Sequence, residues 1–264
     1  MGPEEADLLQ TRELIETLKP FGAFEKDMEL RHREKVVKML ESLYKEWLTE
    51  TCEMMNLPET VTANVGGKIF PFGSYQMGVH SKGADIDALC VGPGFLDRKD
   101  FFTSSFDKLK AQEEVQEIGA IEDAFVPVIK LSFNGIEIIW LEKKIDLVFA
   151  RIAQRSIPDT LDLLDDKILK NLSKRCVRTL VDYRVTEEIL SIHNFRLALR
   201  AVKLWAKREE LPISTLLKWR VEDRYFNLPV WDRRINPAYP QQNTVFNVYP
   251  PTLAVTMEEI QWGM

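Results

Sequence analysis

One stretch in the first half of the chain constrains the fold most: Gly73-Ser74, followed after a short spacer by Asp85-Ile86-Asp87. The pattern is typical of a strand that ends in a Gly/Ser turn, a short helix, and a second strand that carries two acids. Because side chains alternate faces along a strand, Asp85 and Asp87 are predicted to share a face. Two carboxylates crowded on one face raise each other's pKa unless a cation lies between them.

This combination of residue types indicates a particular chemistry. Oxygen ligands on a rigid strand suit Mg²⁺, which binds a few carboxylates and completes its shell with water and phosphate. Gly73 and Ser74 offer a backbone N–H and a hydroxyl where the chain turns into a helix, an arrangement that binds phosphate. An Asp-x-Asp pair alone is more often a surface feature of a strand. Its spacing from the Gly-Ser turn favours metal-assisted nucleotidyl transfer.

Several segments carry a resemblance to a known family. The runs at 72–75 and 83–87 resemble the nucleotidyltransferase signature of the DNA polymerase beta superfamily and, within it, that of the eukaryotic nuclear poly(A) polymerases. Residues 194–208, 227–232 and 236–243 also match that family. The resemblance extends, with gaps, over nearly the whole chain.

The resemblance implies an α/β (α+β) fold. A mixed-sheet nucleotidyltransferase domain is expected at 19–150, and an incomplete all-helical central domain is expected from 1–18 and 151–264. The RNA-binding domain that follows in the family is expected to be absent.

Local patterns predict the individual elements. Apolar spacing predicts helices at 4–18, 26–54, 98–115, 165–180 and 186–209, the last with a break near Ser191. In the 26–54 helix the apolar stripe is expected to face the core and the intervening charges to be solvated. Strands are predicted at 68–72, 85–91 and 145–150, and Asn134-Gly135 predicts a hairpin before the last of these.

A third acid, Asp146, follows that hairpin. By itself it is typical of a strand-end acid. In the family a Gly-Ile-Glu run leads directly into the Ile-Asp pair, whereas here seven residues, Ile138–Lys144, intervene. Because seven is odd, a strand that absorbed them all would turn Asp146 to the other face. Asp146 is therefore predicted to join Asp85 and Asp87 only if the insert loops out or bulges.

The resemblance implies template-independent addition of AMP from ATP to RNA 3′ ends, with release of pyrophosphate by a two-metal mechanism. The metal ligands and catalytic residues it implies are Asp85, Asp87 and Asp146, with Asp146 also the candidate general base. Mg²⁺ or Mn²⁺ is the implied cofactor. The implied ATP-binding residues are Phe72, Gly73, Ser74, Ser81, Asp85, Ile86, Asp87, Val128, Asp146 and Lys203. By its position alone, Lys203 reads as a solvated lysine on a helix. The implied partners are the RNA 3′ end and cleavage and polyadenylation factors, in the nucleus.

The match also breaks in places. After the 194–208 segment, Pro212 stands where the family has a tyrosine, and the family's Gly-Gly-Val segment has no counterpart. Two hypotheses therefore stay open. The chain is an active adenylyltransferase, or it is a catalytically impaired isoform that acts at most as a binding protein.

Composition adds limits. The net charge of −6, from 35 basic and 41 acidic residues, is not that of a self-sufficient nucleic-acid binder. The three cysteines are odd in number and lack metal-ligand spacing, which favours reduced thiols inside a cell. No signal peptide or apolar run of membrane length is recognised, so a soluble protein without membrane contact is expected.

Overall fold

The computed structural model describes residues 5–133, 143–170, 172–190 and 193–208. These residues form two compact units. The sheet unit takes its described residues from 25–78 and 83–187, and the helix unit takes them from 5–24, 79–82 and 188–208. The domain limits predicted from the sequence stay a prediction.

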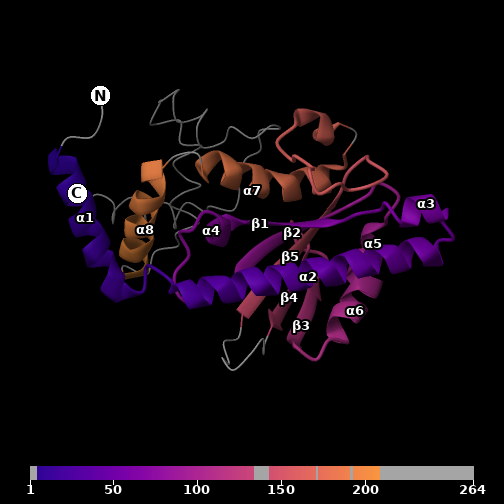
Figure 1. Cartoon of the computed structure of the whole chain (residues 1–264), viewed down its shortest axis with the longest axis horizontal. Coiled ribbons are helices and arrows are strands. Elements are labelled where there is room, and N and C mark those ends of the chain that lie inside the picture. The colour runs from indigo at the N-terminus through magenta and orange to yellow at the C-terminus, as the bar shows by residue number, and fades with distance from the viewer. Residues whose placement is uncertain (1–4, 134–142, 171, 191–192, 209–264) are drawn as a thin grey trace. The chain divides into compact units, whose positions relative to one another are not determined.

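A five-stranded mixed sheet forms the sheet unit (Figure 1). In spatial order its strands are β1 (Lys68–Phe72), β2 (Ile86–Gly92), β5 (Lys143–Arg151), β4 (Val128–Phe133) and β3 (Val115–Ile121). β2 and β5 run parallel, and the other neighbouring pairs are antiparallel. The predicted mixed-sheet fold is confirmed. Pro71 lies on β1, an edge strand, where a missing backbone N–H is tolerated.

The long helix α2 (Asp27–Met54) packs on one face of this sheet. The run of α5 (Arg98–Asp100), a π-helical turn (Phe101–Ser105) and α6 (Phe106–Lys110) covers the same face. The inward stripe of α2 is buried as predicted, and it comprises Val36, Leu40, Tyr44, Trp47 and Leu48. Two charges on α2 depart from the prediction that the intervening charges are solvated, because Glu29 is buried and Arg33 is fully buried.

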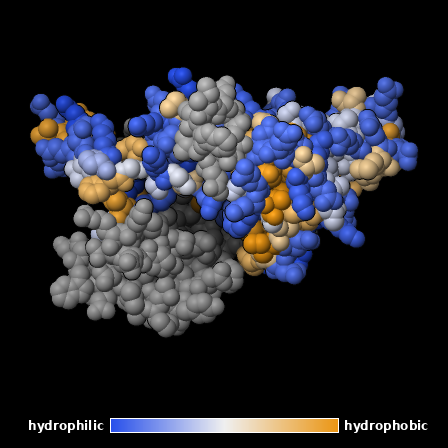
Figure 2. Space-filling model, turned by 90° about the horizontal axis from the view of Figure 1, so that it is seen from below, coloured by the Kyte–Doolittle hydropathy of each residue, from blue (hydrophilic) through white to orange (hydrophobic). Residues whose placement is uncertain are grey.

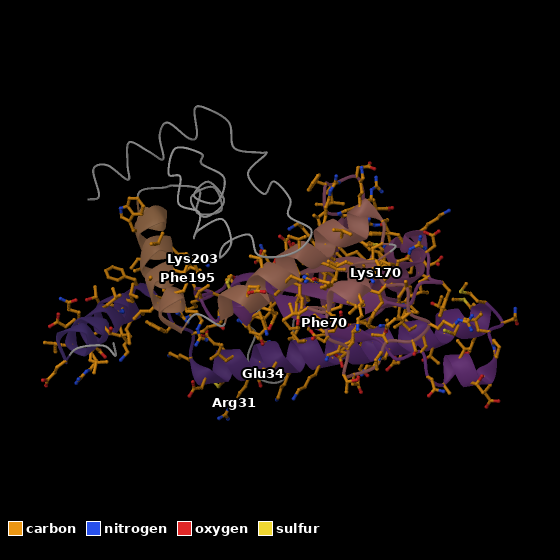
Figure 3. All side chains as sticks on the ribbon, turned by 90° about the horizontal axis from the view of Figure 1, so that it is seen from above. Arg31, Glu34, Phe70, Lys170, Phe195 and Lys203 are labelled. Atoms are coloured by element: carbon orange, nitrogen blue, oxygen red, sulfur yellow. The ribbon has the colours of Figure 1, made fainter. Side chains whose placement is uncertain are left out.

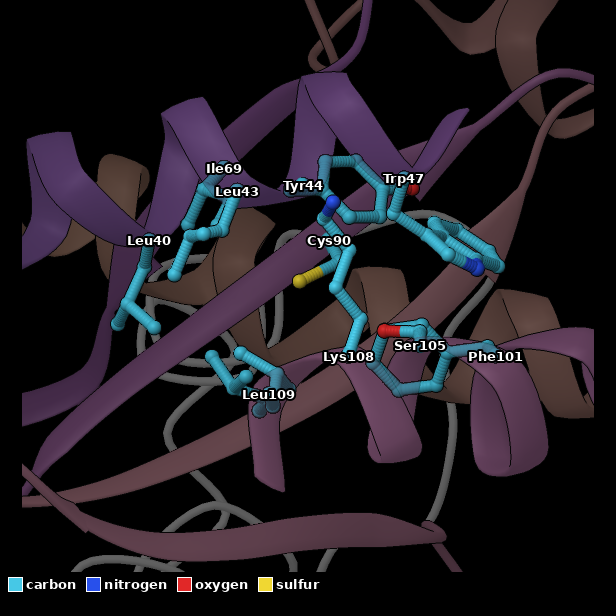
Figure 4. A pocket seen from close by; sticks show the side chains of 11 residues that line it. Leu40, Leu43, Tyr44, Trp47, Ile69, Cys90, Phe101, Ser105, Lys108 and Leu109 are labelled. Carbon is cyan, nitrogen blue, oxygen red and sulfur yellow. The ribbon is translucent and has the colours of Figure 1, made fainter. Parts of the chain in front are cut away.

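A gap of about 10 Å³ remains in this core between α2 and the sheet (Figure 4). Its lining includes Trp47, Cys90 and Phe101. A space of this size is roughly the least that holds one water molecule. The gap is therefore a packing defect and not a nucleotide site.

The opposite face of the sheet is also covered. Leu89 of β2 and Val148 of β5 pack there against the segment 152–169 and against α7 (Lys174–Leu190). Parallel strands buried on both faces read as nearly continuous apolar runs, as β2 and β5 do. By strand alternation, Asp87 and Asp146 lie on this second face, near the starts of their strands.

Two sequence predictions were wrong. The helix predicted at 98–115 ends at Lys110, and β3 follows it. This edge strand is largely exposed and contains a bulge, so it lacks the apolar alternation that reveals a strand. The helix predicted at 165–180 begins only at Lys174, after a short 3₁₀ turn, Asp166–Leu169, and α7 continues to Leu190 through the interruption predicted between 180 and 186. Ser173 accepts the backbone N–H of Cys176, which marks the true start of α7.

Two short helices complete the sheet unit: α3 (Glu59–Thr62) and α4 (Gly73–Gln76). The helix unit contains α1 (Glu5–Leu18), a 3₁₀ turn (Lys19–Phe21) and α8 (His193–Arg208), and α1 packs against α8. The predicted helix at 4–18 is confirmed over the described residues. The predictions beyond residue 208 lie outside the described part of the chain.

Two further features of the protein concern its surface and its cysteines. On the face seen in Figure 2, a strip of hydrophobic side chains lies among hydrophilic ones, and smaller hydrophobic groups lie elsewhere on this face. All three cysteines are buried and unpaired, as expected. Within the described part of the chain, no helix is long and apolar enough to cross a membrane.

Candidate active site

The Gly-Ser turn approaches Asp87 very closely. Phe72 pairs opposite Asp87 across β1 and β2, and Gly73 follows directly. Gly73 has a φ of +66°, and a Cβ built on it would lie 2.5 Å from Oδ2 of Asp87. Only glycine combines this backbone conformation with so close an approach. The predicted juxtaposition of turn and acid is therefore present.

Asp146 lies beside Asp87. The two residues are register partners on the parallel strands β2 and β5, so their side chains leave the same face of the sheet. Residues 138–142 of the insert lie outside the described part of the chain. Lys143 and Lys144 belong to β5, and Lys143 pairs with Phe133 of β4. The strand thus keeps the register that the sequence analysis set as the condition for Asp146.

Asp85 differs from its prediction. It precedes β2 instead of lying within it, and it is exposed. Its charge nevertheless contributes to the raised pKa of Asp87.

The surroundings of Asp87 disfavour the charged form of its carboxyl. Burial, followed in order of effect by the charges of Asp146, Asp85 and Asp182, raises the pKa of this carboxyl to about 6. Lys130 acts in the opposite direction. Such crowding of negative charge is what a divalent cation relieves.

Lys130 is a site residue that the sequence analysis missed. Its Nζ donates to Oδ2 of Asp146 at 2.5 Å, and this hydrogen bond is the main reason why the pKa of Lys130 is raised. Lys130 stands opposite Asp146 across β4 and β5. The signal was available, because Lys130 lies two residues after Val128 on the predicted hairpin strand and shares its face.

The donor set was tested for a metal site. Among the described residues, no three His, Cys, Asp or Glu side chains form a group that could hold a metal ion. Asp146 is engaged by Lys130, so the three carboxylates do not close into one ligand cluster. Their chemistry still fits Mg²⁺. All the donors are carboxylate oxygens, and the negative charges of the neighbouring acids raise the pKa of Asp87. Asp146 could join the other two carboxylates as a metal ligand only if it released the ammonium of Lys130.

The turn itself differs from the expected phosphate cradle. The backbone N–H of Gly73 donates to Oγ1 of Thr186 at 2.9 Å. Thr186 in turn donates to the carbonyl of Asp182, and Gln76 donates to Glu187. The Gly73 donor that was expected for phosphate is therefore used by α7 in this structure. Sequence reasoning had no signal for this pairing, since Gly73 and Thr186 are far apart along the chain.

A comparison with known protein families identifies the family of this chain. The profile of the poly(A) polymerase nucleotidyltransferase domain matches residues 1–192. The chain belongs to this family.

Two curated poly(A) polymerases extend the similarity to 99% of the chain. The poly(A) polymerase of Dictyostelium discoideum is 42% identical and covered over 39% of its length, and nuclear poly(A) polymerase 1 of Arabidopsis thaliana is 33% identical and covered over 44%. The chain thus spans well under half the length of these relatives. The first alignment runs over 320 residues although this chain has 264, so that relative carries internal residues that this chain lacks.

Solved structures are similar at a lower level. The Cid1 poly(U) polymerase is 15% identical with a TM-score of 0.45, over 96% of this chain and 71% of that one. A similarity of this strength bears on neither the site nor the activity.

The remaining nucleotide contacts predicted for this poly(A) polymerase family member lie in two groups. In the sheet unit, Phe72 and Ile86 are buried, whereas Ser74 and Val128 are partly exposed. Ser81 and Lys203 belong to the helix unit, where Nζ of Lys203 donates to the carbonyl of Val79 at 3.2 Å. All these nucleotide contacts stay predictions.

Proposed function

We propose that this chain transfers AMP from ATP to the 3′ hydroxyl of RNA and releases pyrophosphate. One observation carries the proposal: Asp146 stands in register beside Asp87 despite the insert that precedes it. The crowding of acidic charge on Asp87 supports the same site.

The residues have separable roles in this proposal. Asp85, Asp87 and Asp146 would hold the divalent ions, and Asp146 would be available to them once its carboxylate is free of Lys130. Mg²⁺ or Mn²⁺ supplies charge neutralisation at the triphosphate and activation of the hydroxyl. The oxygen of the 3′ hydroxyl bonds to the α-phosphorus, the bond from that phosphorus to the bridging oxygen breaks, and pyrophosphate leaves. Asp146 accepts the proton of the hydroxyl.

In the sheet unit, Phe72, Gly73 and Ile86 line the nucleotide beside the acids. Val128 contacts the base or ribose, and the hydroxyl of Ser74 binds the phosphates. In the helix unit, Ser81 lines the nucleotide and the ammonium of Lys203 binds the phosphates. The backbone N–H of Gly73 can bind the phosphates only after it releases Thr186.

Extension of a labelled RNA primer tests the proposal. With Mg²⁺ or Mn²⁺, ATP is expected to lengthen the primer and UTP to do so far less, while chelation of the metal stops the reaction. Complete absence of extension would contradict the proposal. If ATP with Mn²⁺ raised the melting temperature in that case, the chain would be the impaired, binding-only isoform.

The proposal includes a nuclear location and contact with cleavage and polyadenylation factors. The Arabidopsis relative is a nuclear poly(A) polymerase by name, which supports the location.

A further inference from the structure

A buried cluster of three charged side chains lies in the sheet unit, apart from the acids. The side chains of Glu25 and Arg33 are fully buried, and that of Lys143 is 2% exposed. Arg33 donates from Nε to Oε2 of Glu25 at 2.7 Å and from Nη2 to Oε1 at 2.9 Å. Lys143 donates from Nζ to Oε1 of Glu25 at 3.3 Å. One carboxylate thus joins a guanidinium on α2 to an ammonium at the start of β5.

The cluster contacts each segment that builds the site. Nη2 of Arg33 also donates to the carbonyl of Ala84 at 2.6 Å, directly before Asp85. The guanidinium lies 5.6 Å from the ring centre of Tyr75, in the helix that follows the Gly-Ser turn. Lys143 lies on β5, the strand that carries Asp146.

We propose that Glu25, Arg33 and Lys143 are positioning residues that hold the segments of Asp85 and Asp146 at a fixed separation. The inference rests on the proposed function, because the ligands to be positioned are those of the metal site. Lys143 belongs to the insert, so this chain uses an inserted residue to anchor the strand that the insert interrupts.

The burial of three charges argues against a purely passive role. Taking three charges out of water is costly, and well-packed apolar residues often replace such groups without loss. The cluster binds the backbone directly before Asp85 and lies on the strand of Asp146, so we compare it with the outer partners that orient metal ligands, whose loss typically weakens metal binding by about 10- to 100-fold.

The sign of the effect separates positioning from plain electrostatics. Removal of a positive charge near three carboxylates should by Coulomb's law alone tighten the binding of a divalent cation. If Lys143 positions Asp146, its removal should weaken that binding.

Mn²⁺ binding to the full chain, measured by calorimetry, tests the inference without reference to turnover. Lys143→Met is expected to weaken Mn²⁺ affinity about tenfold, and Lys143→Arg to restore most of it. Lys144→Met is the matched control, because it removes the same charge at the next, exposed position. That variant should bind Mn²⁺ as tightly as the unchanged protein does or slightly more tightly, because it removes a charge near Asp146 and no contact of the cluster.

Arg33→Met provides a second arm, with Arg31→Met on the same helix as its control. Arg31 is exposed and points away from the sheet (Figure 3). Arg33→Met is expected to weaken Mn²⁺ binding at least as much as Lys143→Met, because it also releases the Ala84 carbonyl. If Arg33→Met does not fold, the Lys143 variants decide, since they leave the Glu25–Arg33 pair intact.

Unchanged or tighter Mn²⁺ binding in Lys143→Met would overturn the inference and leave the proposed function standing. Asp87→Asn separates the two claims. If it bound Mn²⁺ as well as the unchanged protein does, the metal site itself would be wrong and the positioning role would fall with it.

Discussion

Replacement of Asp87 by asparagine is expected to reduce primer extension at least about a thousandfold. Asparagine keeps the shape of the side chain but removes the charge that the proposal assigns to the divalent ions. Loss of metal stabilisation amounts to several kcal/mol, and each 1.36 kcal/mol is a tenfold change in rate. Single-turnover extension of the RNA primer measures the effect.

Asp123→Asn is the matched control, because Asp123 is exposed in the turn after β3. It should leave the rate within about twofold, as substitutions away from a site usually do. Equal rates for Asp87→Asn and Asp123→Asn would contradict the assignment of Asp87.

Asp87→Asn, which is expected to lower activity, should raise the stability of the metal-free protein at neutral pH. The folded pKa of Asp87, about 6, lies above its ordinary value of 3.8, so the folded state binds the proton more tightly. Stability is therefore expected to fall as pH rises from about 4 to about 6, by about 2–3 kcal/mol. Asp87→Asn should remove this fall and be the more stable protein at pH 7. Urea unfolding at several pH values tests this, and parallel profiles would contradict it.

Gly73→Ala is expected to have the second largest effect, about a hundredfold loss of activity. Its Cβ would lie 2.5 Å from Oδ2 of Asp87, so the carboxylate or the turn must move. A displacement near 1 Å in an active site can cost about a hundredfold in rate. The left-handed backbone adds about 1–2 kcal/mol of strain.

Gly83→Ala isolates the contact from the backbone strain. Gly83 also has a positive φ, +79°, but a Cβ there meets nothing within 4 Å. Both variants should therefore lose comparable stability from the backbone, while Gly73→Ala alone loses the extra amount due to the clash. Extension rates and urea unfolding of the two proteins, measured side by side, give the comparison. If Gly83→Ala lost as much activity as Gly73→Ala, the approach of the turn to Asp87 would not explain the loss.

The periodicity of apolar residues was sufficient to predict those helices and strands that pack on a core. The stripe of α2 and the apolar runs of β2 and β5 could be predicted because burial imposes their spacing. β3 could not, since an exposed edge strand places no such demand on its side chains. The start of α7 was missed because a 3₁₀ turn precedes it and mimics the helical pattern.

The sequence indicated that Asp87 lies beside the Gly-Ser turn, but the cations around the acids were not predicted. The Gly-Ser turn and the Asp-x-Asp pair lie close together in the chain, so local geometry brings them together. Lys130 and Arg33 act through contacts that tertiary packing creates. A charged residue on a helix such as α2 is ordinarily solvated. Arg33 is instead buried, because its charge is paired with Glu25, which also pairs with Lys143.

The central claim is that Asp146 shares a divalent ion with Asp85 and Asp87 despite the insert before it. Anomalous diffraction from crystals of the protein with Mn²⁺ and ATP locates the ions directly. The account predicts two Mn²⁺ peaks between Asp85 and Asp87, one of them also bound by Asp146, with Lys130 displaced from its carboxylate. A structure in which Mn²⁺ and ATP are bound while Asp146 stays paired with Lys130 would contradict it.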